Sequence, residues 1–117
     1  MSVAETELLF VYGSLKRGFS NHRKLAVAQF VGECRTAQRY QLSLLGVYPA
    51  LSAEGDRAIA GELYAVDARI LSALDEFEGE AYRRGAVELS DGRVAQAYFL
   101  APKWRASAVP DPRDRWL

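Results

Sequence analysis

Residues 11–18 read VYGSLKRG, so a glycine–serine turn with a basic end stands where an apolar run stops. Three kinds of site fit such a turn: a phosphate-binding loop, a nucleophilic serine, or backbone N–H groups that bind a small carboxylate. A phosphate-binding loop needs Lys and then Ser or Thr after its second glycine, but Phe19 and Ser20 follow Gly18. A nucleophilic serine needs the pattern G-x-S-x-G, but Leu-Lys-Arg follows Ser14. The turn is therefore either a donor site for a small carboxylate or oxyanion, or a tight turn without chemistry.

Glu78 is the second candidate for chemistry. It lies four residues after Leu74 and seven after Leu71, which places it on the apolar stripe of the helix expected here. Burial raises the pKa of a carboxyl group, and a raised pKa suits a general acid or base near neutral pH. The alternative is an ion pair with Arg83 or Arg84. The neighbouring acidic residues are expected to form a solvated helix end.

The chain has one histidine, His22, and one cysteine, Cys34, so neither an intramolecular disulfide nor a zinc site of the usual kind is expected. A pair of Ser14 with His22 is conceivable, but nothing in the sequence orders it, and a surface or capping histidine is favoured. Cys34 lies in a strand-like stretch and is expected to be a small buried hydrophobic residue. No metal ligand set is predicted.

Strands and one longer helix are expected to position these residues. Strands are predicted at residues 8–12, 30–40, 58–66, 84–89 and 94–100, with a strand, a turn and a second short strand within 41–51. The SDG sequence between the last two strands indicates a hairpin. Helices are predicted at 20–28, capped by Ser20 or Asn21, and at 68–77, between an Asp67 N-cap and Gly79. Five or six strands with two helices predict an α+β fold with a mixed or antiparallel sheet that closes into a small barrel.

Length and composition narrow the class of protein. A chain of 117 residues fits one domain over 1–117, and the formal net charge of zero argues against a nucleic-acid binder. The N-terminal residues show neither a signal peptide nor a membrane span, and the single cysteine fits a reducing compartment, so a cytoplasmic protein is expected. The segment from Pro102 onward is expected to be irregular structure on the surface, docked by its two tryptophans.

Five segments together resemble the gamma-glutamylcyclotransferase family, most nearly its gamma-glutamylamine cyclotransferases and their bacterial relatives. They are, in order, FVYGSLKRG, NH at 21–22, GELYAVD at 61–67, LDEFEG at 74–79 and YRR at 82–84. The resemblance implies a small mixed β-barrel with flanking short helices. It also implies an enzyme, classed as a lyase or acyltransferase, that needs no metal and no cofactor.

The resemblance assigns substrate-binding residues by position. The turn formed by Tyr12, Gly13, Ser14 and Leu15 matches the family's substrate loop, whose backbone amides hold the α-carboxylate of a glutamyl group. Tyr82 matches a tyrosine that lines the pocket. The implied substrate is a small gamma-glutamyl amine or peptide.

Glu78 matches the family's catalytic glutamate. In this picture the glutamyl α-amine attacks its own γ-carbonyl, and 5-oxoproline and a free amine are released. Glu78 accepts the proton of the attacking amine and returns it to the leaving nitrogen. Two alternatives remain: a binding protein that keeps the pocket without turnover, and a hydrolase of small amides that uses Ser14.

Overall fold

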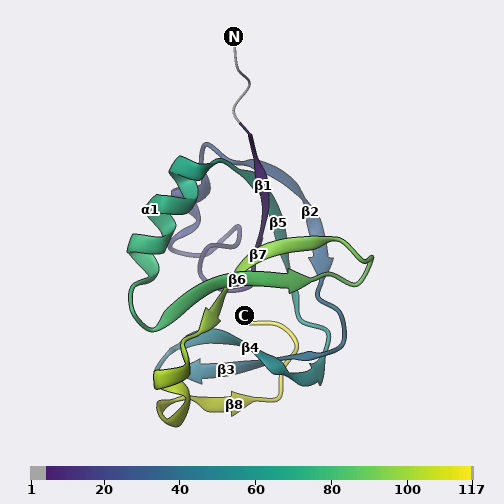
Figure 1. Ribbon diagram of the computed structural model, residues 1–117, viewed down its shortest axis with the longest axis vertical. Coiled ribbons are helices and arrows are strands. Elements are labelled where there is room, and N and C mark those ends of the chain that lie inside the picture. The colour runs from purple at the N-terminus through teal and green to yellow at the C-terminus, as the bar shows by residue number, and fades with distance from the viewer. Residues whose placement is uncertain (1–4, 117) are drawn as a thin grey trace.

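Eight β-strands form one mixed sheet in the computed structural model, which describes residues 5–116 (Figure 1). The strands are β1 (Glu7–Val11), β2 (Gln29–Arg35), β3 (Tyr40–Leu45), β4 (Tyr48–Arg57), β5 (Ala60–Val66), β6 (Tyr82–Glu88), β7 (Val94–Leu100) and β8 (Val109–Asp111). The helices are α1 (Ala68–Glu78) and two short 3₁₀ helices, His22–Leu25 and Pro102–Ser107. The predicted α+β class is confirmed.

The sheet follows the order β2-β5-β1-β7-β4-β3-β8, and β6 also pairs with β7. Strand β7 pairs in parallel with β1 and with β4, and the remaining pairs are antiparallel. Within residues 5–116, the end strands β2 and β8 do not pair with each other, so closure into a barrel is not confirmed. The predicted count of five or six strands is too low.

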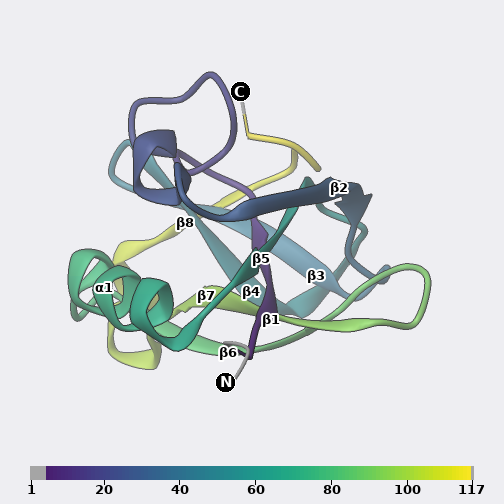
Figure 2. The ribbon, with the colours of Figure 1, turned by 90° about the horizontal axis from the view of Figure 1, so that it is seen from above.

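Strand β1 is buried on both faces, as its unbroken apolar run predicts. Leu9 and Val11 point to the side covered by α1, and Phe10 and Tyr12 point to a second cluster on the opposite side. Figure 2 shows α1 lying to one side of β1, β5 and β7. The loop that follows β1 therefore leaves from the centre of the fold, where its position is fixed by packing on both sides.

Helix α1 begins and ends where the sequence predicts, within one residue. The Asp67 carboxylate accepts a hydrogen bond from the Ile70 N–H at 2.9 Å, which satisfies one free donor of the first turn. Gly79 ends the helix with a φ of 70°, a conformation that favours glycine. Glu78 is the last helical residue, so the helical spacing that places it on the stripe of Leu71 and Leu74 holds.

The predicted helix at 20–28 is wrong in extent, because only the 3₁₀ turn His22–Leu25 forms. Asn21 precedes this turn but does not cap it, since its side-chain amide donates to the Ser14 hydroxyl at 2.8 Å instead. The predicted strand at 30–40 ends at Arg35, and β3 begins at Tyr40. The predicted hairpin of β6 and β7 is confirmed.

The segment from Pro102 onward is more ordered than the sequence indicates. It forms a 3₁₀ helix and then β8, which pairs antiparallel with β3. The Trp116 ring packs against Phe19 with ring centroids 5.0 Å apart, and it also contacts the larger core cluster. The predicted docking of this segment is confirmed for Trp116, whereas the prediction of irregular structure throughout the segment is wrong.

Candidate active site

The residues singled out in the sequence line one cavity of about 360 Å³, between the loop after β1 and the end of α1. Its walls are formed by Phe10, Val11, Tyr12, Gly13, Ser14, Leu15, Asn21, Tyr48, Pro49, Phe77, Glu78, Tyr82 and Tyr98. Pockets for small molecules span about 300–1,000 Å³, so this cavity is suited to a ligand of few atoms. The turn and the carboxylate of Glu78 therefore border the same space, although they are far apart in the sequence.

The loop that follows β1 lines this cavity and contains backbone N–H groups without a partner in the described residues. A turn closes where the Lys16 N–H donates to the Gly13 carbonyl at 3.0 Å. Among the hydrogen bonds of residues 5–116, none uses the N–H of Ser14 or Leu15. A backbone donor without a partner is costly to bury, and an anion is a strong acceptor for it. Ser14 and Leu15 thus each have a backbone donor that is free to bind an anion.

Gly13 is required by the close approach of another strand. A Cβ atom at this position would lie 2.8 Å from Cγ of Pro49, the second residue of β4. The rigid proline ring cannot turn away, so a larger residue would displace either the loop or β4. Both Gly13 and Pro49 line the cavity. Gly13 is therefore required because Pro49 leaves no room for a side chain, and not because the backbone adopts an unusual angle there.

Glu78 is half-buried, and burial raises the pKa of its carboxyl group to about 7. No ion pair within residues 5–116 involves Glu78, so the alternative in which Arg83 or Arg84 neutralises it is wrong. Arg84 instead binds both carboxylate oxygens of Asp75, at 2.9 and 3.1 Å. Glu78 is left as a carboxyl group whose proton is exchangeable near neutral pH.

The tyrosines in the cavity wall are fixed by hydrogen bonds. The Tyr82 hydroxyl donates to the Pro49 carbonyl at 2.8 Å, and burial together with the nearby Glu78 raises its pKa to about 12. The Tyr12 hydroxyl donates to the Tyr98 carbonyl and accepts from the Leu51 N–H, and burial raises its pKa as well. These phenols stay neutral at physiological pH and serve as walls.

Tyr98 and Asp75 hold α1 in place beside the cavity, although neither residue stands out in the sequence. The Tyr98 hydroxyl on β7 donates to Asp75 at 2.7 Å, and Arg84 on β6 binds the same carboxylate. The Arg84 hydrogen bonds hold the pKa of Asp75 below its usual range, so the group stays ionised. These contacts tie the last turns of α1 to β6 and β7 and thereby fix Glu78. No local sequence signal distinguishes Asp75 from the other helix-end acids.

The cavity mouth is formed by aromatic residues that were not singled out either. Tyr48 is 55% exposed and Phe77 is 42% exposed, and both line the cavity. Phe77 follows the apolar spacing of α1, but it is exposed and lies in the cavity wall rather than in the core. The Lys24 ammonium group lies 4.2 Å from the centre of the Phe77 ring. Aromatic side chains therefore border the exposed part of the cavity.

Ser14 has no base beside it. Its hydroxyl accepts from the Asn21 amide, while Nδ1 of His22 lies 3.0 Å from the Leu15 carbonyl oxygen. The conceivable pair of Ser14 with His22 is therefore not formed. Cys34 lies on β2 outside this cavity, half-buried, and burial raises the pKa of its thiol to about 11, which keeps it protonated.

Two further features bear on what the chain can bind. In the part of the chain that the structure describes, no three His, Cys, Asp or Glu side chains gather closely enough to hold a metal ion. No helix within residues 5–116 has the length and apolar character needed to cross a membrane.

Comparison with known proteins identifies relatives over nearly the whole length. Residues 9–117 match the family described as gamma-glutamyl cyclotransferase, AIG2-like. A Vibrio cholerae protein, named only provisionally as a gamma-glutamylcyclotransferase, is 38% identical over 92% of this chain and 93% of its own. The human gamma-glutamylaminecyclotransferase is 43% identical over 61% of this chain and 52% of its own.

A solved structure shares the fold. The crystal structure of an AIG2-like protein from Mus musculus has a TM-score of 0.74 and 27% sequence identity, covering 97% of this chain and 89% of that one. Together with the family match, this likeness confirms the resemblance seen in the sequence. The chain belongs to the gamma-glutamyl cyclotransferase, AIG2-like family, and it is an enzyme of the gamma-glutamylcyclotransferase type.

Proposed function

We propose that this enzyme cyclises the glutamyl group of a small gamma-glutamyl amine or peptide, releasing 5-oxoproline and the free amine. The observation that carries the proposal is one cavity lined by Ser14 and Leu15, whose backbone N–H groups have no partner in the described residues, and by Glu78, whose carboxyl group has a pKa near neutrality. The family match supports the reaction class, and the names of relatives such as the human gamma-glutamylaminecyclotransferase support the substrate class.

In the proposed complex, the α-carboxylate of the glutamyl group accepts hydrogen bonds from the N–H groups of Ser14 and Leu15. A carboxylate bound to two fixed amides is held without a positively charged side chain, in keeping with a cavity wall that contains neither Lys nor Arg. Anchoring one end of the glutamyl group restricts its remaining torsions. Ring closure to five members then profits from orientation, which is the main contribution the protein can supply.

Glu78 moves the proton in this proposal. The α-amine of the substrate forms the new C–N bond to the γ-carbonyl carbon, and Glu78 accepts a proton from that nitrogen. The resulting tetrahedral intermediate collapses when the bond to the leaving nitrogen breaks, and Glu78 returns the proton to it. A carboxyl group with a pKa of about 7 both accepts and donates a proton readily at neutral pH. No water molecule or other reactant is consumed.

The two alternative functions receive less support. Ser14 has no base to activate it, which argues against a serine hydrolase. A binding protein without turnover would have no need for a buried carboxyl group whose ionisation opposes folding above neutral pH. The serine hydrolase is tested by a search for a covalent adduct on Ser14, and the binding protein by a measurement of turnover.

The experiment is a screen of gamma-glutamyl amines, amino acids and peptides in which released 5-oxoproline is quantified by mass spectrometry. The wild-type protein is compared with Glu78→Gln and with Glu76→Gln, a matched control because Glu76 is exposed on the same helix and does not line the cavity. Stoichiometric release of 5-oxoproline and amine by the wild type and by Glu76→Gln, but not by Glu78→Gln, is expected. Release of free glutamate instead would indicate hydrolysis, and binding without release would indicate a protein that lacks turnover.

A further inference from the structure

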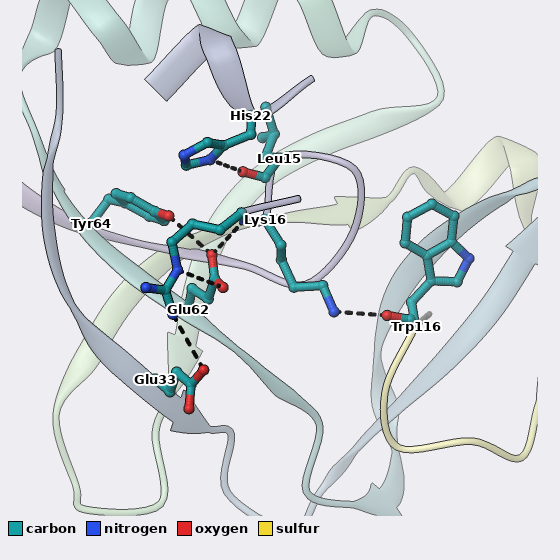
Figure 3. A network of polar contacts seen from close by, with 8 residues as sticks. Leu15, Lys16, His22, Glu33, Glu62, Tyr64 and Trp116 are labelled. Carbon is teal, nitrogen blue, oxygen red and sulfur yellow. Dashed lines mark hydrogen bonds and ion pairs between the residues drawn. The ribbon is translucent and has the colours of Figure 1, made fainter. Parts of the chain in front are cut away.

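A network of polar contacts ties the substrate loop to the rest of the protein (Figure 3). The Ser14 hydroxyl accepts from Asn21 at 2.8 Å, and the Leu15 carbonyl oxygen lies 3.0 Å from Nδ1 of His22. Both contacts come from the segment directly after the loop, so they shape the loop but do not fix it to the sheet. The two residues that follow, Lys16 and Arg17, make the long-range contacts.

Arg17 is bound to Glu62, which lies on β5 directly opposite the last residue of β1. One carboxylate oxygen of Glu62 accepts the backbone N–H of Arg17 at 2.9 Å and the Tyr64 hydroxyl at 3.0 Å. The other accepts Nε of Arg17 at 3.3 Å. Glu62 is only 7% exposed. A buried carboxylate costs free energy unless its oxygens are bonded, and here a loop backbone donor supplies one of the bonds.

Lys16 makes the second long-range contact. Its ammonium group donates to the Trp116 carbonyl at 2.7 Å, and the residue is only 8% exposed. The Trp116 ring packs against Phe19, at the far end of the same loop. Figure 3 shows the side chains of Lys16 and Glu62 extending from the loop and from β5 toward these partners. We call the contacts of Arg17 with Glu62 and of Lys16 with Trp116 the loop anchors.

The loop anchors have a consequence for the free donors of Ser14 and Leu15. A donor contributes most to binding when it already points at the position of the ligand, because no reorganisation is then needed. Loops without long-range contacts sample many conformations, and ordering them on binding lowers affinity. The anchors attach to the two residues that directly follow the donors. They therefore fix the donors' direction without occupying the cavity.

We propose that Glu62 and Lys16 are positioning residues that hold the substrate loop in its carboxylate-binding conformation. Neither acts on the substrate, and Glu62 does not line the cavity. This inference rests on the proposed function, since it assigns the loop the binding of the substrate carboxylate. It adds that affinity depends on a buried carboxylate of β5 and on the C-terminal segment that contains Trp116.

The kinetic test compares Glu62→Ala with Glu62→Gln and with Glu33→Gln. The glutamine oxygen can still accept from the Arg17 N–H and from Tyr64, so Glu62→Gln should restore most of the function. Glu33→Gln is the matched control, because Glu33 contacts only the exposed guanidinium of the same arginine, at 3.3 Å. We expect Glu62→Ala to raise KM about tenfold with kcat nearly unchanged, because the lost interaction stabilises the bound substrate and the transition state equally. The KM values of the other two variants should stay within about threefold of that of the wild type. An unchanged KM in folded Glu62→Ala, or an equal rise in Glu33→Gln, would overturn the proposal.

A second measurement needs no turnover and covers the case in which Glu62→Ala fails to fold. Amide hydrogen exchange is recorded by NMR at positions 16 and 21, whose N–H groups bond to the Gly13 and Ser14 carbonyls. Lys16→Met keeps the apolar stem and removes the ammonium group, and with it the bond to the Trp116 carbonyl and the contact with the Phe19 ring, whose centre lies 5.0 Å away. We expect exchange at these two positions to be about tenfold faster in Lys16→Met, with exchange in β5 unchanged, as for local opening. Wild-type exchange rates in that variant would overturn the proposal. If the wild type itself releases no 5-oxoproline, the proposed function fails, and the exchange rates still decide whether the anchors order the loop.

Discussion

Replacing Glu78 with Gln should stabilise the protein above neutral pH while it removes the activity. Burial raises the pKa of Glu78 from 4.5 to about 7, so the folded protein favours the neutral carboxyl group relative to the unfolded chain. This preference contributes fully to stability below the unfolded-state pKa and is lost as the pH rises through about 7. At pH 8 the wild type therefore carries a buried charge that the amide does not.

The size of the effect follows from the displacement of the pKa. Each pKa unit corresponds to about 1.4 kcal/mol, so the charge opposes folding at pH 8 by at most about 3–4 kcal/mol. Solvent reaches part of the half-buried side chain, which makes this an upper bound. The difference in stability between variant and wild type should shrink toward zero near pH 4, where Glu78 is largely protonated in both the folded and the unfolded protein. For a chain of this size, 1 kcal/mol shifts Tm by about 4 °C, so the gain at pH 8 is at most on the order of 10 °C.

The assay measures Tm and 5-oxoproline release on the same samples of wild type and Glu78→Gln between pH 4 and pH 8.5. General acid/base catalysis contributes about 10²- to 10⁴-fold, and we expect kcat to fall by that order. Affinity for 5-oxoproline should change much less, because in the proposed complex the N–H groups of Ser14 and Leu15 bind the carboxylate independently of Glu78. The exposed Glu76→Gln serves as the control and should change neither quantity.

One combination of results would refute this reasoning. If Glu78→Gln is less stable than the wild type at pH 8 and turns over normally per folded molecule, then Glu78 is a structural residue with an unrecognised partner. A stabilised variant that keeps its activity would instead leave the burial argument intact and remove Glu78 from the mechanism.

Three further predictions concern the same cavity. The pH dependence of wild-type kcat/KM should show an acid limb with an apparent pKa of about 7 that is absent from the residual activity of Glu78→Gln; an unchanged limb would assign that titration to another group. Gly13→Ala should lower the free energy of unfolding by about 1–3 kcal/mol and weaken 5-oxoproline binding, because its Cβ would meet Pro49 at 2.8 Å. Gly85→Ala is the matched control, because its Cβ would make only ordinary contacts, at 3.5 Å or more. Equal losses of stability and of 5-oxoproline affinity in the two variants would contradict the steric argument. Ser14→Ala should keep kcat within about tenfold, since its hydroxyl only accepts from a neighbouring amide, and a covalent adduct on Ser14 by mass spectrometry would disprove this.

The parts of the fold that local sequence determines were predictable. The unbroken apolar run of β1 predicted burial on both faces, and the Asp67 cap, the apolar spacing and Gly79 predicted α1 to within one residue. Strand β8 was not predictable, because three residues that include Pro110 carry little strand signal. They pair with β3, which is distant in the sequence, so only the tertiary fold creates the strand. Whether the sheet closes depends on the same kind of non-local pairing, so local sequence could not decide between an open sheet and a barrel.

Some features of the candidate site were likewise predictable from local sequence, and others depend on the tertiary fold. Helical spacing alone placed Glu78 on a buried stripe, and the turn at Gly13 was visible as a break after an apolar run. The bond between Tyr98 and Asp75 depends on how α1 packs on β7, and the sequence does not encode that contact locally. Glu62 did carry a signal, since it is a charged residue within an apolar strand, and the reasoning applied to Glu78 would have found it.

The most direct test of the account is a crystal structure of the protein with bound 5-oxoproline. The account predicts that the product's carboxylate oxygens lie within about 2.7–3.2 Å of the N–H groups of Ser14 and Leu15, as for ordinary hydrogen bonds. It also predicts that the lactam ring fills the cavity beside Glu78, whose carboxyl group lies within hydrogen-bond reach of the lactam nitrogen, directly or through one water molecule. A product bound with its carboxylate on an arginine outside this cavity, or with Glu78 beyond reach of the lactam, would contradict the account.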